Sequence, residues 1–251
     1  MKKTRFIALL LAVILITSLT ACGKKTADEP GASSGPNAYG YVDTEYTKTY
    51  SDAKGKPVYD ISYTLPRFPE EDTTMQRVNE YFDSLFMTAK SNGVSAEANL
   101  SGLSKPWRET AVYSLTYADD DYLSFDVTVT LDTGEEQHVI SRELSLFSRE
   151  TGLRMSLENF ETSKQAINLL CSCVAAYIEK EYTTVVPEGA TVYNTFNRQS
   201  FCLTENGFRV AFPSGIITLS ERGPIVVDLP LSDFTDYYGN LPNMPQNADK
   251  S

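Results

Sequence analysis

The strictest pattern in the chain is the alternation of apolar and polar residues from Leu123 to Leu131. Because successive side chains of a β-strand point to opposite faces, this segment is predicted to be a strand with one buried face and one polar face. Asp132-Thr133-Gly134 follows and predicts a turn into a second strand over 138–147. Strands joined by such a short turn pair in the antiparallel sense, so the sheet is at least partly antiparallel.

Weaker alternation predicts further strands along the chain, near 46–50 and over 59–65, 111–117, 153–157, 201–204, 208–212 and 225–229. The turn Asp52–Gly55 joins the first two of these strands, and Pro66 and Pro69 are expected to end the second. Glu205-Asn206-Gly207 between two apolar segments is a strong hairpin signal.

Two segments show the 3.6-residue period of an amphipathic helix, Met75–Ala89 and Ser163–Tyr182. Thr73 with Gln76, and Thr162 with Gln165, have the spacing of a capping box. Asn92-Gly93 is expected to end the first helix. The predicted fold class is α+β: two helix-plus-antiparallel-meander units, 41–160 and 161–238, packed as one globular body.

The first 22 residues read as an export signal. Lys2, Lys3 and Arg5 precede a largely apolar stretch of 14 residues, Phe6–Leu19, which is shorter than the roughly 20 residues that a spanning helix needs. Leu19-Thr20-Ala21-Cys22 resembles the bacterial lipobox. It predicts a signal peptide over 1–21 and a diacylglyceryl group on the Cys22 sulfur; the alternative is an ordinary secretory signal followed by a chance cysteine.

The lipobox places the mature chain at the outer face of a cell membrane, anchored by its lipid. Residues 22–40, rich in Lys, Gly, Ala, Ser and Pro, are predicted to be a flexible tether, and 239–251 a loose tail. Loss of residues 1–21 removes three of the 22 basic side chains and none of the 33 acidic ones, so the net charge becomes −14. A chain this acidic, without a basic run, is excluded as a nucleic-acid binder.

Catalytic chemistry has little support in the residues. His138 is the one histidine, which excludes zinc sites that need two, and no motif positions a nucleophile. Beside Glu135-Glu136, His138 reads either as a general base or, more simply, as a surface histidine. Asp119–Asp121 with Asp126 reads either as oxygen ligands for calcium or as a solvated hairpin tip. We therefore predict no catalytic residue, no metal site and no cofactor.

Two further features leave alternatives open. Cys171 and Cys173 point about 200° apart on a helix, so they cannot share one metal ion. Either of them can form a disulfide with Cys202 in an oxidising compartment, or all three can be buried thiols. Trp107, between Pro106 and Arg108, is either a contact for a sugar or protein partner or a tryptophan that closes the edge of the core.

The order of elements resembles paired cell-envelope domains of unknown function from Gram-positive bacteria. The resemblance covers about Thr47 to Phe234 and rests on 59–66 leading into the helix at 75–89, on 147–153, and on 201–207 through 225–230. Such domains form the non-catalytic region of PdaC-type peptidoglycan deacetylases and the extracellular region of RsiV-type lysozyme-sensing anti-sigma factors. This chain shows neither the deacetylase domain nor the spanning helix of those proteins.

The resemblance implies a binding protein of the envelope rather than an enzyme, with a wall component or a cationic lysozyme-like protein as its ligand. The alternative is an accessory or degenerate protein associated with peptidoglycan hydrolases or deacetylases. A third interpretation is a lipoprotein with a purely structural role in the envelope.

The lipobox gives the first testable prediction. Mass spectrometry of the mature amino terminus should find a diacylglyceryl group on Cys22, because the signal is cut directly before that residue. Cys22→Ala should accumulate uncut precursor or release protein into the medium. An unmodified Cys22, or a cut at another site, would contradict the assignment.

Overall fold

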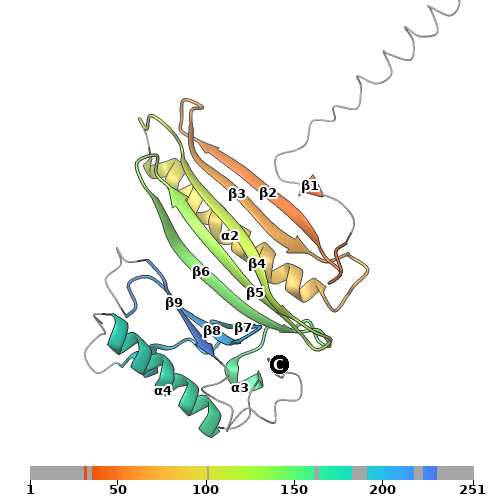
Figure 1. The fold of residues 1–251 in the computed structure, drawn as a ribbon. Coiled ribbons are helices and arrows are strands. Elements are labelled where there is room, and N and C mark those ends of the chain that lie inside the picture. The colour runs from red at the N-terminus through yellow and green to blue at the C-terminus, as the bar shows by residue number, and fades with distance from the viewer. Residues whose placement is uncertain are drawn as a thin grey trace, which may run out of the picture.

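The computed structural model describes residues 31–32, 36–100, 102–160, 164–182, 191–217 and 223–230. The signal peptide, Cys22 and the tail 239–251 lie outside these ranges. The strands form two sheets (Figure 1), with orders β1-β2-β3-β4-β5-β6 and β7-β8-β9. Their bounds are β1 Gly31–Ala32, β2 Val42–Ser51, β3 Pro57–Arg67, β4 Trp107–Ala118, β5 Tyr122–Asp132, β6 Gln137–Ser148, β7 Phe201–Thr204, β8 Gly207–Phe212 and β9 Ile225–Pro230.

The helices are α2 Gln76–Asn99, α3 Leu157–Phe160, α4 Lys164–Glu181 and α5 Val192–Thr195. None of the helices within the described ranges is long and apolar enough to cross a membrane. The α+β class, with two helix-bearing sheet units, is as predicted from the sequence. Strand β1 lies within the predicted tether and pairs with β2.

The large sheet contains one pairing that the sequence does not predict. Strands β2–β3, β4–β5 and β5–β6 are antiparallel, but β3 and β4 are parallel. Parallel neighbours need a long crossover, and α2 supplies it by carrying the chain back to the end where β3 begins. This crossover decides which loops meet at each end of the large sheet.

Strands β5 and β6 separate two hydrophobic cores. On β5, Leu123, Phe125 and Val127 belong to the first core, which lies between the large sheet and α2. On β6, Phe147 points into the same core, whereas its neighbour Leu146 points into the second core. The alternation of a strand therefore turns adjacent residues toward opposite layers.

The molecule has four layers. Helix α2 packs along β2 and β3 on one face of the large sheet, and the small sheet contacts β4, β5 and β6. Helix α4 packs on the small sheet, and its buried face, which includes Ile167, Leu170 and Val174, belongs to the second core. Figure 1 shows the large sheet extending well beyond the small one.

Several local predictions are corrected by the structure. Strand β3 continues through Pro66, which pairs with Asp43. The first helix has no capping box: its N-cap is Met75, and the Asp72 carboxylate accepts from the Met75 N–H at 3.0 Å. The strand expected over 153–157 is reduced to one bridge at Arg154, and Leu157 begins α3.

The expected helix end at Gly93 is also wrong, since α2 continues to Asn99. Gly93 is buried where the helix passes the Tyr50 ring, and a Cβ there would lie 2.2 Å from a ring carbon. The Tyr50 hydroxyl donates to the Lys90 carbonyl oxygen at 2.9 Å, which fixes the ring. Gly93 thus serves a close approach of helix and strand, not a turn.

Gly93→Ala should therefore destabilise the fold, although alanine favours helices by about 1 kcal/mol over glycine. We expect a net loss of about 1–3 kcal/mol in the free energy of unfolding, because an overpacked core must shift. Urea titration measures it. Val94→Ala, at an exposed position of the same helix, is the control and should change stability little. Equal or higher stability of Gly93→Ala would contradict the close packing.

Candidate functional site

The loops of the large sheet gather at its two ends. The chain enters β2 at one end, here called the near end, where the β3–α2, β4–β5 and β6–α3 connections also lie. The β2–β3, α2–β4 and β5–β6 connections lie at the opposite, far end. Binding residues are often carried on loops that a rigid sheet holds in place, so the two ends are the candidate sites.

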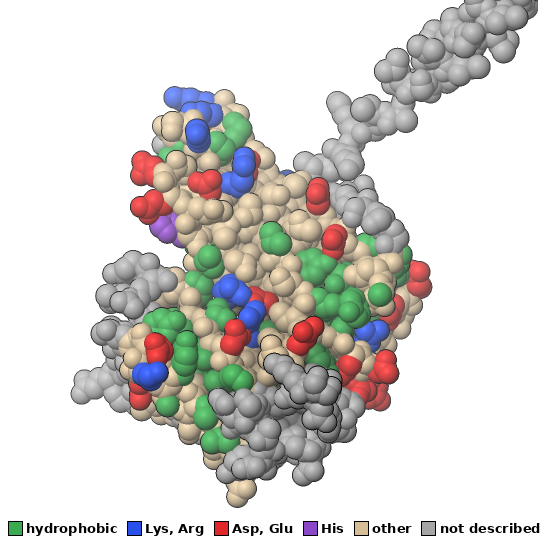
Figure 2. Space-filling view, in the orientation of Figure 1, with side chains coloured by type: hydrophobic (Ala, Val, Ile, Leu, Met, Phe, Trp, Pro, Cys, Tyr) green, Lys and Arg blue, Asp and Glu red, His purple; other side chains and the backbone are tan. Residues whose placement is uncertain are grey.

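The near end is strongly acidic. Its loops touch: the Arg149 N–H donates to the Asp121 carbonyl at 2.8 Å, and Arg77 Nη1 donates to the Thr151 carbonyl at 2.7 Å. Figure 2 shows acidic side chains gathered at the lower right of the molecule. The acidic residues of these three loops, called the acidic end below, are Glu70, Glu71, Asp72, Asp119, Asp120, Asp121 and Glu150.

Part of the acidic end is used to build its own turns. Asp119 Oδ1 accepts from the N–H groups of Asp121 and Tyr122, and Asp72 Oδ1 accepts from the Met75 N–H just before α2. Among the described residues, no group of three His, Cys, Asp or Glu side chains is arranged to hold a metal ion. The sequence motif Asp119–Asp121 therefore lies at a hairpin tip, while Asp126 lies elsewhere, between the two sheets.

Trp107 and His138 both lie at the far end, on β4 and β6, with β5 between them. Trp107 begins β4, is partly buried and packs against the first core. His138 begins β6 and is exposed, with its Nε2 3.2 Å from Glu136 Oε2. This is the position of a surface histidine. A role of Trp107 in ligand contact stays a prediction.

The three cysteines that the structure describes lie in the second unit, and no disulfide joins them. Cys171 is buried in the second core, and Cys173 packs against that core from a partly buried position. Cys202 is buried on β7 against the large sheet, and burial raises the pKa of its thiol to about 12. A thiol with a raised pKa is a poor nucleophile, so Cys202 is chemically inert in this fold.

A buried carboxylate under α2 was missed from the sequence. Glu109, on β4, is 1% exposed and accepts hydrogen bonds from the hydroxyls of Tyr59 and Tyr63. Asn92 Nδ2, on α2, lies 3.4 Å from Glu109 Oε2. Burial, and then the Glu109 carboxylate, raise the pKa of both tyrosines, so they remain protonated donors. The cluster is satisfied internally and is structural.

A second buried carboxylate joins the two sheets. Asp126, on β5, is 3% exposed and receives Arg142 Nε at 2.9 Å and Arg209 Nη1 at 3.0 Å. Arg209, on β8, also binds Asp228 on β9, with Nε 2.6 Å from Oδ1. This network crosses from the large sheet to the small one and fixes their contact.

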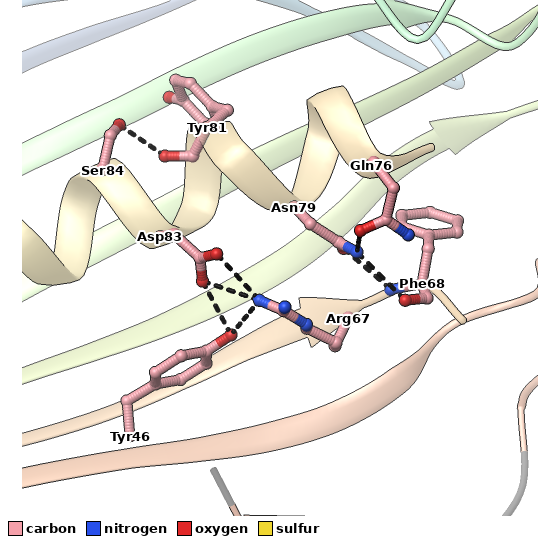
Figure 3. A network of polar contacts seen from close by, with 8 residues as sticks. All are labelled: Tyr46, Arg67, Phe68, Gln76, Asn79, Tyr81, Asp83 and Ser84. Atoms are coloured by element: carbon pink, nitrogen blue, oxygen red, sulfur yellow. Dashed lines mark hydrogen bonds and ion pairs between the residues drawn. The ribbon is translucent and has the colours of Figure 1, made fainter. Parts of the chain in front are cut away.

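Polar contacts also fasten α2 to the large sheet (Figure 3). Arg67 Nη1 lies 2.8 Å from Asp83 Oδ1, and the Tyr46 hydroxyl donates to the same carboxylate at 3.1 Å. Asn79 on α2 exchanges two hydrogen bonds with the backbone of Phe68, at 2.9 and 3.0 Å. These contacts hold the β3–α2 loop and thus shape the acidic end.

The face of β2–β4 that α2 does not cover is rich in hydroxyls. Thr49 donates to Asp60 at 2.7 Å, and the hydroxyls of Thr110 and Thr130 lie 2.6 Å apart. In Figure 2 the surface over the large sheet is mostly tan, with charged side chains toward its borders. The exposed uncharged positions of this face are Thr47, Thr49, Ser62, Val112 and Ser114. On this face of the sheet, the charged side chains therefore lie toward the borders.

Comparison with known proteins gives structural neighbours only. No protein-family model matches the chain, and no curated protein matches it. A DUF3298 family member from Bacteroides fragilis is 13% identical, with a TM-score of 0.48, over 81% of this chain and 94% of that one. A DUF3298 family protein from Pseudomonas aeruginosa is 11% identical, with a TM-score of 0.45, over 83% and 94%.

Both neighbours carry a designation for a domain of unknown function, and neither name states a ligand or an activity. The finer resemblance to PdaC-type and RsiV-type proteins stays a prediction.

The Glu109 cluster yields a stability prediction. Tyr63→Phe removes one donor from a buried carboxylate, so the free energy of unfolding should fall by about 1–3 kcal/mol. Chemical denaturation measures the change. Tyr177→Phe, which removes a hydroxyl from an exposed tyrosine, should leave stability unchanged. If both variants unfold at the same denaturant concentration as the parent protein, the cluster contributes nothing to stability.

Proposed function

We propose that this is a lipid-anchored, non-catalytic binding protein on the outer face of a Gram-positive cell membrane. Its acidic end takes a cationic secreted protein of the lysozyme class. The anchor rests on the sequence around Cys22, and the partner class rests on charge and on the resemblance to sensor domains. A wall component is the other ligand that this resemblance implies.

The observation that carries the proposal is the concentration of seven carboxylates on three touching loops. Among the described residues, these loops carry two basic side chains, Arg149 and Arg154, with Arg77 of α2 beside them, and the whole mature chain has a net charge of −14. A concentrated field of one sign raises the association rate of an oppositely charged protein by a factor of about 10 to 1000. Such steering also disfavours the anionic polymers of the wall as partners for this end.

The test is association of the mature protein, held in a non-ionic detergent, with a purified cationic lysozyme. Binding should be detectable at low salt, and the association rate should fall as salt rises from roughly 0.05 to 0.5 M, because the screening length shrinks to a few ångströms. Surface plasmon resonance measures the rate. No binding at low salt, or a rate that ignores salt, rejects the proposal.

A pair of matched variants locates the surface. Glu70→Gln/Glu71→Gln/Asp120→Asn removes three exposed charges from the acidic end while sparing the capping residues. Glu97→Gln/Glu135→Gln/Glu136→Gln removes three exposed charges at the far end. The first variant should lower the association rate about tenfold and the second much less. Equal effects would show that only net charge matters and that the acidic end is not the surface.

A further inference from the structure

One exposed strip of α2 carries no charged side chain over about four turns. Its residues, called the outer strip below, share one face of the helix because they are three, four or seven positions apart: Ser84, Met87, Thr88, Ser91, Val94, Ser95 and Ala98. Met87 and Val94 are 56% and 58% exposed, and they are the large hydrophobic residues that this helix exposes. Lys90 and Glu97 lie on the flank of the helix, about 100° or more from Ser91.

The hydroxyls of the outer strip are already bonded within the helix. Thr88 donates to the Ser84 carbonyl oxygen at 3.0 Å, and Ser91 donates to the Met87 carbonyl oxygen at 3.1 Å. Ser84 and Ser95 likewise donate to carbonyl oxygens of the preceding turn. Because these hydroxyls keep their partners when water leaves, the strip can be covered without leaving a polar group unsatisfied.

We propose that the outer strip packs against the outer strip of a second copy, with the two α2 helices antiparallel. A twofold axis close to Ser91 places Met87 of each copy against Val94 of the other. The two large side chains lie four and three residues from Ser91, on either side of it, so the strip is complementary to itself. The small side chains around the axis, such as Thr88 and Ser95, let the helices approach closely.

The distribution of charge favours the antiparallel arrangement. Helix α2 begins beside the acidic end and runs 24 residues toward the far end (Figure 1), about 36 Å at 1.5 Å per residue. An antiparallel pair holds the two acidic ends several screening lengths of about 8 Å apart. Each acidic end, and Glu80 which continues the strip toward it, then lies beside the far end of the other copy, where exposed side chains of both signs occur. A parallel pair would bring the two acidic ends together.

The contact is small, so the dimer is weak. A strip of four turns is about 22 Å long and 11 Å wide, which gives roughly 250 Å² per copy. A stable interface buries about 800 Å² per partner. Pairing is therefore expected at high local concentration, which the proposed lipid anchor supplies by confining copies to one surface. The acidic end is not used, so self-association and lysozyme binding can fail separately.

Disulfide trapping tests the antiparallel register. Met87→Cys and Val94→Cys are made as separate variants of the mature protein, mixed in equal amounts in excess non-ionic detergent and oxidised. A disulfide needs Cβ atoms about 4 Å apart, so the antiparallel pair should give mixed disulfides well above the statistical proportion. Intact mass spectrometry distinguishes mixed dimers from homodimers, because the two variants differ in mass.

Two controls accompany the trapping. Ser62→Cys mixed with Val112→Cys, both exposed on the uncovered sheet face, should give the statistical proportion. The parent protein, oxidised alike, measures the background from its described cysteines, which are buried or partly buried.

Sedimentation velocity at rising protein concentration measures the association itself. Met87→Ser/Val94→Ser should weaken self-association at least about tenfold, because two apolar side chains are lost from each side of the contact. Val112→Ser changes a valine of similar exposure, 61%, on β4 and should self-associate as the parent does. Thermal unfolding checks that both variants are folded.

Four results would overturn the proposal: a parent that sediments as a monomer throughout, mixed disulfides at the statistical proportion, homodimers in excess, or equal self-association of the two serine variants. Lysozyme association separates this proposal from the proposed function. Met87→Ser/Val94→Ser removes no charge, so its association rate with lysozyme should equal that of the parent. A parent that forms the mixed disulfide but binds no lysozyme supports the pairing and rejects the acidic end.

Discussion

The fold depends on the burial of β5 and β6 on both faces. Side chains such as Phe125 and Phe147 pack under α2, while Leu146 packs with the small sheet, so the strands are buried on both faces over 123–127 of β5 and 144–147 of β6. Asp126 is a charged residue that is buried on β5, between the two sheets. It is tolerated because two arginines surround it, and removal of one partner of such a pair commonly costs about 3–5 kcal/mol. The small sheet thus packs on the large sheet through hydrophobic contacts, and the ion pair between Arg209 and Asp126 fixes its position.

The sequence pattern was sufficient for most elements. Alternation identified β5, and the Asn206-Gly207 turn identified the β7–β8 hairpin, because both are local signals. The parallel pairing of β3 and β4 has no local signal, since it depends on the path of α2. Gly93 was misread for a similar reason: a glycine that ends a helix and one that admits a neighbouring ring look alike in sequence. From the sequence alone, Glu109 would be taken as a surface residue, because its two tyrosine donors lie on another strand.

The candidate sites were less predictable than the fold. Unusual residues are easy to find in the sequence, as with Trp107, His138 and Asp119–Asp121. Whether they form a site depends on which loops lie at the same end of the sheet, and the sequence does not show this. Only the crossover through α2 brings the loop before Trp107 to the β2–β3 turn, where Lys56 donates to the Leu103 carbonyl oxygen. The lipid site predicted at Cys22 is the reverse case, because the prediction uses the sequence alone and Cys22 lies outside the described residues.

The concentration of carboxylates at the acidic end makes the domain an electric dipole with its negative pole where the chain enters β2. The cytoplasmic membrane carries anionic lipids, whose surface potential reaches about one screening length into solution. With the proposed lipid on Cys22, that potential repels the acidic end whenever this end comes within a screening length of the membrane. The resulting torque turns the acidic end away from the lipid surface when the domain comes close. Orientation at the cell surface is thereby sensitive to ionic strength and to lipid charge, without any contact between the domain and the membrane.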